Sequence, residues 1–213
     1  VALINRARLA VRDRQWPTVA AFAGEILRQQ PTSAEGHFLL GVAEKASNRP
    51  AKAREAFEQA LQLDSGRYDV AVELANQYSI ARRNGEAAEL LARYESMLAE
   101  SPLYLDMAGT VYTEIGLPQK AYPLYKKAVE LQPGVDIFRS NLASSAVYAG
   151  LIDEAREIYL SLLERFPDHR RNHYYLSRLE RARDDRHLGQ MLALLESGKA
   201  NARPDENIFL YYA

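Results

Sequence analysis

The chain has 213 residues, of which 47% are hydrophobic and 26% are charged, a composition typical of a soluble folded protein. Its 27 basic and 28 acidic residues leave a formal net charge of −1, so no general positive field is available to hold a nucleic-acid backbone. Cysteine is absent, which excludes disulfides and thiolate metal sites, and no apolar run reaches the roughly 18–20 residues that span a bilayer.

These features predict that neither nucleic acid nor a membrane is a partner. No signal-peptide pattern opens the chain, and a cytoplasmic location is the expectation. The chain begins at Val1 and stops at the apolar segment IFLYYA, so we expect both ends to be cuts in a longer protein. Arginine outnumbers lysine and alanine is abundant, which favours a bacterial source.

The elements predicted along the chain are pairs of helices that repeat. The segment NRPAKAREAFEQALQLDS at 48–65 returns as GLPQKAYPLYKKAVELQP at 116–133 and as GLIDEAREIYLSLLERFP at 150–167. A step of 34 residues connects one buried-type alanine slot and one large apolar slot in successive copies. These slots hold Ala53, Ala87, Ala121 and Ala155, and then Phe57, Leu91, Tyr125 and Tyr159.

Spacings of three and four place such residues on one helix face. Turn signals near Asn48, Asn84–Gly85, Gly116 and Gly150 divide each copy into two helices. We expect small residues, such as Gly41, where two helices cross closely. Prolines are expected to close the second helix of a copy, and they are Pro31, Pro102, Pro133 and Pro167.

The period and slots resemble those of the tetratricopeptide repeat over nearly the whole chain. The resemblance implies an all-α fold, a right-handed superhelical solenoid of antiparallel helix pairs forming one domain. The predicted copies are 1–33 (degenerate), 34–67, 68–101, 102–135, 136–169 and 170–203 (degenerate), with a further truncated helix at 204–213. In the last copy, Leu176, Ser177, Gly189 and Ala193 occupy the recurring slots.

In the family, the first helix of each pair lines a concave inner wall that binds partners. Transferred slot by slot, this implies a wall that is acidic in the middle of the chain and basic and aromatic near its end. The candidate partner-binding residues are Asp69, Glu73, Asn76, Asp106, Thr110, Asn141, Ser144, Arg171, Tyr175 and Arg178. The lysine and asparagine pattern with which some family members clamp a terminal carboxylate is not assembled in the matching slots.

No motif of catalysis or phosphate binding is present, so we predict no catalytic residue and no cofactor. His169 and His173, four residues apart beside Asp168, have a spacing that can hold a metal, with His187 as the one further candidate. A surface histidine and a packed one explain them as well, and no metal site is predicted. Asp184 or Asp185 is expected to cap the next helix.

Three functions follow from this sequence. The first is a non-catalytic scaffold that binds a protein or peptide in the inner wall. The second is an accessory domain of a larger enzyme, because Asp185 and His187, Pro204–Glu206 and Ile208–Tyr212 resemble a region that links such repeats to a bacterial sulfotransferase domain. The third is self-association, with a homodimer formed through the ends of the stack.

Overall fold

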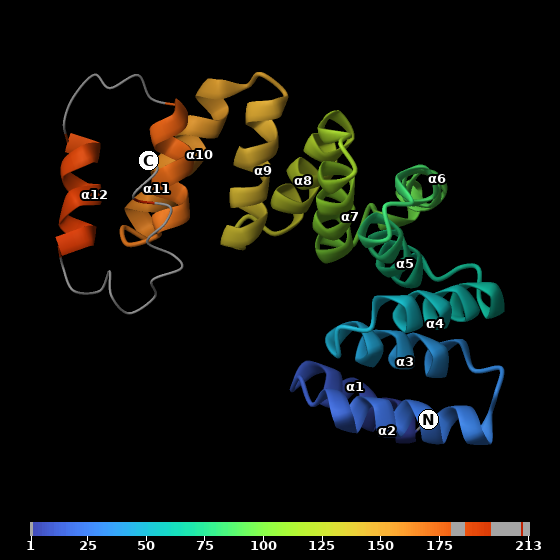
Figure 1. Cartoon of the computed structure of the whole chain (residues 1–213). Helices are drawn as coiled ribbons and strands as arrows, with labels where there is room; N and C mark the ends of the chain where they lie inside the picture. The colour runs from blue at the N-terminus through green and yellow to red at the C-terminus, as the bar shows by residue number, and fades with distance from the viewer. Residues whose placement is uncertain (1, 180–185, 197–209, 211–213) are drawn as a thin grey trace. The chain divides into compact units, whose positions relative to one another are not determined.

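The computed structural model describes residues 2–179, 186–196 and 210 (Figure 1). The described residues form helices and no strand, so the expected all-α class is confirmed. The chain divides into two compact units, residues 1–117 and residues 118–213, and each is described by itself. The predicted copy boundaries, and the interpretation as one domain, stay predictions.

Unit 1 consists of antiparallel helix pairs and a short 3-10 turn. Its elements are α1 (Ala2–Arg12), α2 (Trp16–Gln29), α3 (Ala34–Ala46), α4 (Pro50–Leu63), α5 (Tyr68–Ile80), α6 (Asn84–Tyr94), η1 (Glu95–Leu98) and α7 (Pro102–Glu114). Unit 2 contains α8 (Pro118–Leu131), α9 (Asp136–Tyr148), α10 (Ile152–Arg165), α11 (Arg170–Leu179) and α12 (Arg186–Glu196). No helix in the described part of the chain is both long and apolar enough to cross a membrane.

The recurring slots form the core of both units, as predicted. The alanine slot is fully buried in every copy that was aligned on it: Ala53, Ala87, Ala121 and Ala155 are each 0% exposed. The large apolar slot is buried as well, from Phe57 to Tyr159. Burial of these side chains is the main favourable term that stabilises each helix pair.

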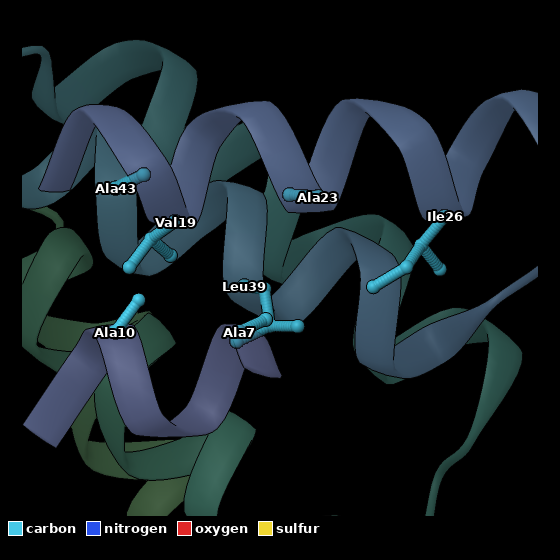
Figure 2. Close-up of a cluster of buried hydrophobic side chains, with 7 residues drawn as sticks. All are labelled: Ala7, Ala10, Val19, Ala23, Ile26, Leu39 and Ala43. Carbon is cyan, nitrogen blue, oxygen red and sulfur yellow. The ribbon is translucent and has the colours of Figure 1, made fainter. Parts of the chain in front are cut away.

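At the N-terminal end of unit 1, small side chains let three helices approach closely (Figure 2). Ala7 and Ala10 of α1 face Val19 of α2, and the cluster is completed by α3. The whole cluster consists of Ala7, Ala10, Val19, Ala23, Ile26, Leu39 and Ala43. The eroded first copy therefore still packs through the slots that its sequence retains.

The close crossing expected at Gly41 is present between α3 and α4. A β-carbon on Gly41 would lie 2.5 Å from a ring carbon of Phe57, which is closer than carbon atoms can approach without displacement. Phe57 is itself 0% exposed, so its ring has no free space in which to move. Glycine at this slot thus lets the aromatic ring of α4 fill the gap.

A left-handed residue ends the first helix of each pair, again at steps of 34 residues. The positive φ angles are 55° at Arg14, 56° at Asn48, 60° at Arg82, 82° at Gly116 and 77° at Gly150. The next residue donates to a carbonyl five residues back, as from Arg83 to Tyr78 at 2.9 Å, which is the Schellman type of helix end. The turn expected at Asn84–Gly85 therefore lies earlier, at Arg82, because Asn84 already begins α6.

Prolines both follow and begin helices. Pro31, Pro133 and Pro167 lie two residues beyond the ends of α2, α8 and α10, as expected of residues that close a helix. Pro102 was assigned the same role, and that assignment is wrong, because it is the first residue of α7. A proline suits the first helical position, where its missing N–H has no partner to lose.

The last pair departs from the repeat. Leu176 of α11 is buried as predicted, but Gly189 and Ala193 of α12 are exposed, so their assignment to packing slots is wrong. Instead, α12 buries Met191 and Leu194, which form a small cluster with Leu210. These apolar residues are spaced three apart, and their side chains, being larger than those of glycine or alanine, determine which face of the helix packs. The predicted cap at Asp184 or Asp185 lies outside the described residues.

Candidate functional site

A hollow of about 180 Å³ opens in unit 2 between α9, α10 and α11. It brings together four of the predicted wall residues: Asn141, Ser144, Arg171 and Tyr175. The other lining residues are Asp136, Ile137, Ser140, Leu162, Phe166, His169 and Asn172. Residues of α9 and α11 therefore meet as the repeat predicts, since both are first helices of their pairs.

The floor of the hollow is fixed by hydrogen bonds from neighbouring helices. Ser144 of α9 shares a hydrogen bond of 2.8 Å with the hydroxyl of Tyr159, which α10 holds fully buried. Burial raises the pKa of Tyr159 to about 12, so this phenol stays neutral at physiological pH. Ser140 donates to the side-chain oxygen of Asn172 at 3.2 Å, which ties α9 to α11. The floor is thus neutral and rigid.

Positive charge lies at the edge of the hollow. The guanidinium of Arg171 donates to the hydroxyl of Tyr175 at 3.2 Å and lies 5.6 Å from the centre of its ring. Tyr175 in turn stacks on Tyr159, with ring centres 5.7 Å apart. One turn further along α11, Arg178 donates to the hydroxyl of Tyr174 at 2.8 Å, but it does not line the hollow. Of the predicted basic and aromatic end, Arg171 and Tyr175 therefore belong to the site.

The predicted acidic wall of unit 1 is different, because ion pairs occupy it. Both carboxylate oxygens of Glu73 accept from the ammonium of Lys45 at 2.7 Å. Asp69 accepts from two nitrogens of Arg67, at 2.8 and 2.7 Å. Glu35 then accepts from Arg67 at 2.9 Å and from Arg8 at 2.8 Å, so the chain of pairs extends back to α1. These acids are neutralised within the unit.

The remaining predicted residues of unit 1 offer little to a partner. Glu73 is 7% exposed and Asp106 is 8% exposed, so neither carboxylate lies on an open surface. Thr110 donates back to the carbonyl of Asp106 on its own helix. The amide oxygen of Asn76 accepts a long hydrogen bond of 3.5 Å from Gln77. The structure gathers no hollow around these side chains.

A larger hollow, of about 380 Å³, lies elsewhere in unit 1, among α4, α5 and α6. Leu61, Leu74 and Leu90 contribute apolar surface, and Glu89 lies at its edge. Tyr78 donates to Glu58 at 3.1 Å within it, and burial raises the pKa of this phenol. Sequence reasoning missed this hollow, since it is lined mainly by second helices, to which the family resemblance assigned only packing.

The histidines form a pair instead of a metal site. His173 is 2% exposed, and its Nδ1 lies 2.9 Å from Nε2 of His187. The Nδ1 of His169 accepts from the backbone N–H of Asn172 at 3.2 Å. Within the described residues, no group of three or more histidine, cysteine, aspartate or glutamate side chains could hold a metal ion.

Comparison with known proteins places these helix pairs in a family. Sequence models of the tetratricopeptide repeat match residues 34–67, 104–134 and 140–196, which together cover more than half of the chain. The chain is a tetratricopeptide repeat protein. The matches show no link to a sulfotransferase family, and the residues on which that resemblance rests lie mostly outside the described part. No curated protein matches the chain.

Solved structures share the fold of this tetratricopeptide repeat protein. YrrB, a repeat protein described as having an unusual peptide-binding site, is 20% identical with a TM-score of 0.68, over 89% of this chain and 96% of its own. The pilF protein of Pseudomonas aeruginosa is 18% identical with a TM-score of 0.64, over 98% of this chain and 87% of its own. MamA is 20% identical with a TM-score of 0.60, over 74% and 92%. At these identities the likeness shows the solenoid fold and nothing further.

Proposed function

We propose that this tetratricopeptide repeat protein is a non-catalytic scaffold that binds a peptide segment of a partner protein at the hollow of unit 2. The observation that carries this proposal is the convergence of Asn141, Ser144, Arg171 and Tyr175 around one cavity. Polar groups that converge on a partly apolar hollow are the usual makings of a binding site. The fold similarity to YrrB, which has a peptide-binding site, is consistent with it.

The size and lining of the hollow define the anchoring residue of the peptide. A cavity of roughly 150 Å³ holds a benzene-sized group, so about 180 Å³ suits one large apolar side chain. Ile137, Leu162 and Phe166 supply the apolar contacts for it. Amide and hydroxyl groups, such as those of Asn141, suit the peptide backbone, and Arg171 favours an acidic residue beside the anchor.

A selection from a library of random twelve-residue peptides tests this proposal. The chain is compared with a variant carrying Asn141→Ala, Arg171→Glu and Tyr175→Ala, and with the control Lys127→Glu. Lys127 is a charged residue of α8 that is half exposed and lies outside the hollow. We expect an aromatic or aliphatic anchor with an acidic neighbour among the selected peptides.

The selected peptides should bind the triple variant at least about tenfold more weakly and the control as well as the original chain, measured by fluorescence polarisation. Equal binding to the triple variant would show that the hollow of unit 2 is not the site. A circular-dichroism melt of all three proteins separates loss of binding from loss of folding.

Self-association is a second candidate, favoured by the exposed face of α12. Leu188 and Leu192, one turn apart on this helix, are 49% and 48% exposed while Met191 and Leu194 are buried. Two such faces could pair in a homodimer. The change Leu188→Glu with Leu192→Glu should then convert a dimer into a monomer in sedimentation equilibrium. A monomeric parent chain would exclude this candidate.

The accessory-domain proposal has no such support from the described residues. It depends on the segment from Asp185 to Tyr212, of which most lies outside them. A phosphosulfate-binding domain encoded downstream in the same reading frame would support it.

A further inference from the structure

His173 is held between two hydrogen-bond partners inside unit 2. Its Nε2 lies 2.7 Å from the carbonyl oxygen of Pro167, in the turn between α10 and α11. Its Nδ1 lies 2.9 Å from Nε2 of His187 on α12, and the two rings stack with centres 5.2 Å apart. His173 thus connects α12 to the preceding part of the unit.

These partners fix where the protons lie. A carbonyl oxygen only accepts, so Nε2 of His173 carries a proton and donates it to Pro167. The Nδ1 of neutral His173 is then an acceptor, and Nε2 of His187 must donate to it. If both rings become charged, two N–H groups face each other at this distance, and the hydrogen bond is replaced by repulsion.

The surroundings of His173 disfavour its charge. His187 from α12, and His169 from the turn before α11, add like charge as they protonate, while Asp168 in that turn is the opposing carboxylate. Arg170 and Arg171 begin the same helix, and α10 packs against α11 through Leu162 and Leu163, which are apolar. Burial is the largest cause, and it lowers the pKa of His173.

We propose that the pair of His173 and His187 is a pH-sensitive latch, which holds α12 against α11 at neutral pH and releases it in acid. The apolar residues of α12 support this assignment. Met191 and Leu194 pack with Leu210 in a cluster of their own, while the core cluster around Leu176 includes no residue of α12. The attachment of α12 to α11 therefore relies on the histidine pair more than the other helices rely on any one hydrogen bond.

Unit 1 contains the same arrangement without the latch. His37 occupies the slot of His173 four copies earlier, and its Nε2 lies 3.0 Å from the carbonyl oxygen of Pro31. His37 thus makes the proline contact of His173, while its ring stacks on no second histidine among the aromatic contacts of unit 1. The proline contact is therefore a structural feature of the slot, and the pH sensitivity is specific to the second histidine.

Hydrogen exchange read by mass spectrometry tests the latch on the full chain. Protection of amides 186–196, corrected for the intrinsic rate, is compared at pH 7.5 and 5.0. We expect protection to fall about tenfold for each pH unit below the pKa of the latch, as one proton is taken up on release. In His187→Gln, whose amide donates at neutral pH and can flip to accept from a charged His173, the loss should be less than about twofold. The control His37→Gln should behave as the parent chain does.

A parent chain without acid-induced loss, or an equal loss in His187→Gln, would overturn the proposal. A titration of the histidine Cε1 protons by NMR gives a test that needs no variant. The midpoint for His173 should coincide with the midpoint of the exchange change in 186–196. Midpoints that lie more than about one pH unit apart would overturn the latch as well.

Discussion

The first helices of the two units present different surfaces, although the same slots build them. In unit 1, the acids that face away from the core are matched by cations from adjacent helices, as Glu73 is by Lys45. In unit 2, the corresponding slots hold Asn141, Ser144 and Tyr175, which surround an open hollow. The comparison shows that a repeat fold fixes where a surface lies, whereas the choice between internal pairing and binding depends on neighbouring side chains.

Charge pairing explains why the slots of unit 1 are satisfied. A carboxylate that is 7% exposed, like that of Glu73, is costly without a partner, and Lys45 supplies two short contacts to it. The side chains around the hollow of unit 2 bear mostly neutral polar groups, which tolerate an aqueous cavity at little cost. We therefore expect mutations in the two walls to affect different properties, stability in unit 1 and binding in unit 2.

The largest difference is expected from removing one cation from each wall. Lys45→Met should lower the free energy of unfolding by about 2 kcal/mol, because Glu73 is left buried and unpaired. Arg171→Met should lower it by less than about 0.5 kcal/mol, since Arg171 is exposed. Urea unfolding followed by circular dichroism measures both.

The double variant Lys45→Met with Glu73→Leu provides the control for this prediction. Replacing both charges with apolar groups should recover most of the loss. If Lys45→Met were no more destabilising than Arg171→Met, the two walls would not differ in the way described. A double variant as unstable as Lys45→Met would instead assign the loss to the packing of the Lys45 stem.

A smaller effect is expected from the phenol beneath the hollow. Tyr159→Phe should cost about 1 kcal/mol at pH 7, because Ser144 loses a buried partner. The raised pKa of Tyr159, about 12, means that the unfolded chain loses this proton first, near pH 10. Stability should therefore fall as pH rises from about 10 to 12, and Tyr159→Phe should reduce that slope in urea titrations. An unchanged slope would show that Tyr159 ionises as readily in the folded chain.

Much of the fold could be predicted from sequence because packing repeats at a fixed step. Alanine at Ala53 and its equivalents can only mean a close contact when the slot recurs in phase, and all of these alanines are buried. The register of α12 could not be predicted in this way, since Gly189 and Ala193 kept the residue class but not the packing. Once the spacing between two helices changes, a slot number no longer identifies a face.

The site was predictable only in part, for a different reason. Asn141 and Arg171 belong to first helices of successive copies, so the repeat alone brings them together. The pairing of Arg67 with Glu35 joins residues 32 positions apart, from a loop to a helix, and no slot rule identifies the loop residue. The histidine pair also joins a repeat slot to a helix outside the repeat register, so neither periodicity nor composition indicated it.

The smallest effects are expected at the left-handed helix ends, where unit 1 has Arg82 and unit 2 has Gly150. A side chain at φ of 60° is strained, so Arg82→Gly should stabilise the chain by up to about 0.5 kcal/mol after the added freedom of the unfolded state is subtracted. Gly150→Ala should destabilise it by about 1 kcal/mol through backbone strain alone, because no atom lies within 4 Å of the added β-carbon. Opposite signs in thermal unfolding would confirm that this slot is set by backbone geometry. If Arg82→Gly were destabilising, the contacts of the Arg82 side chain would outweigh the strain.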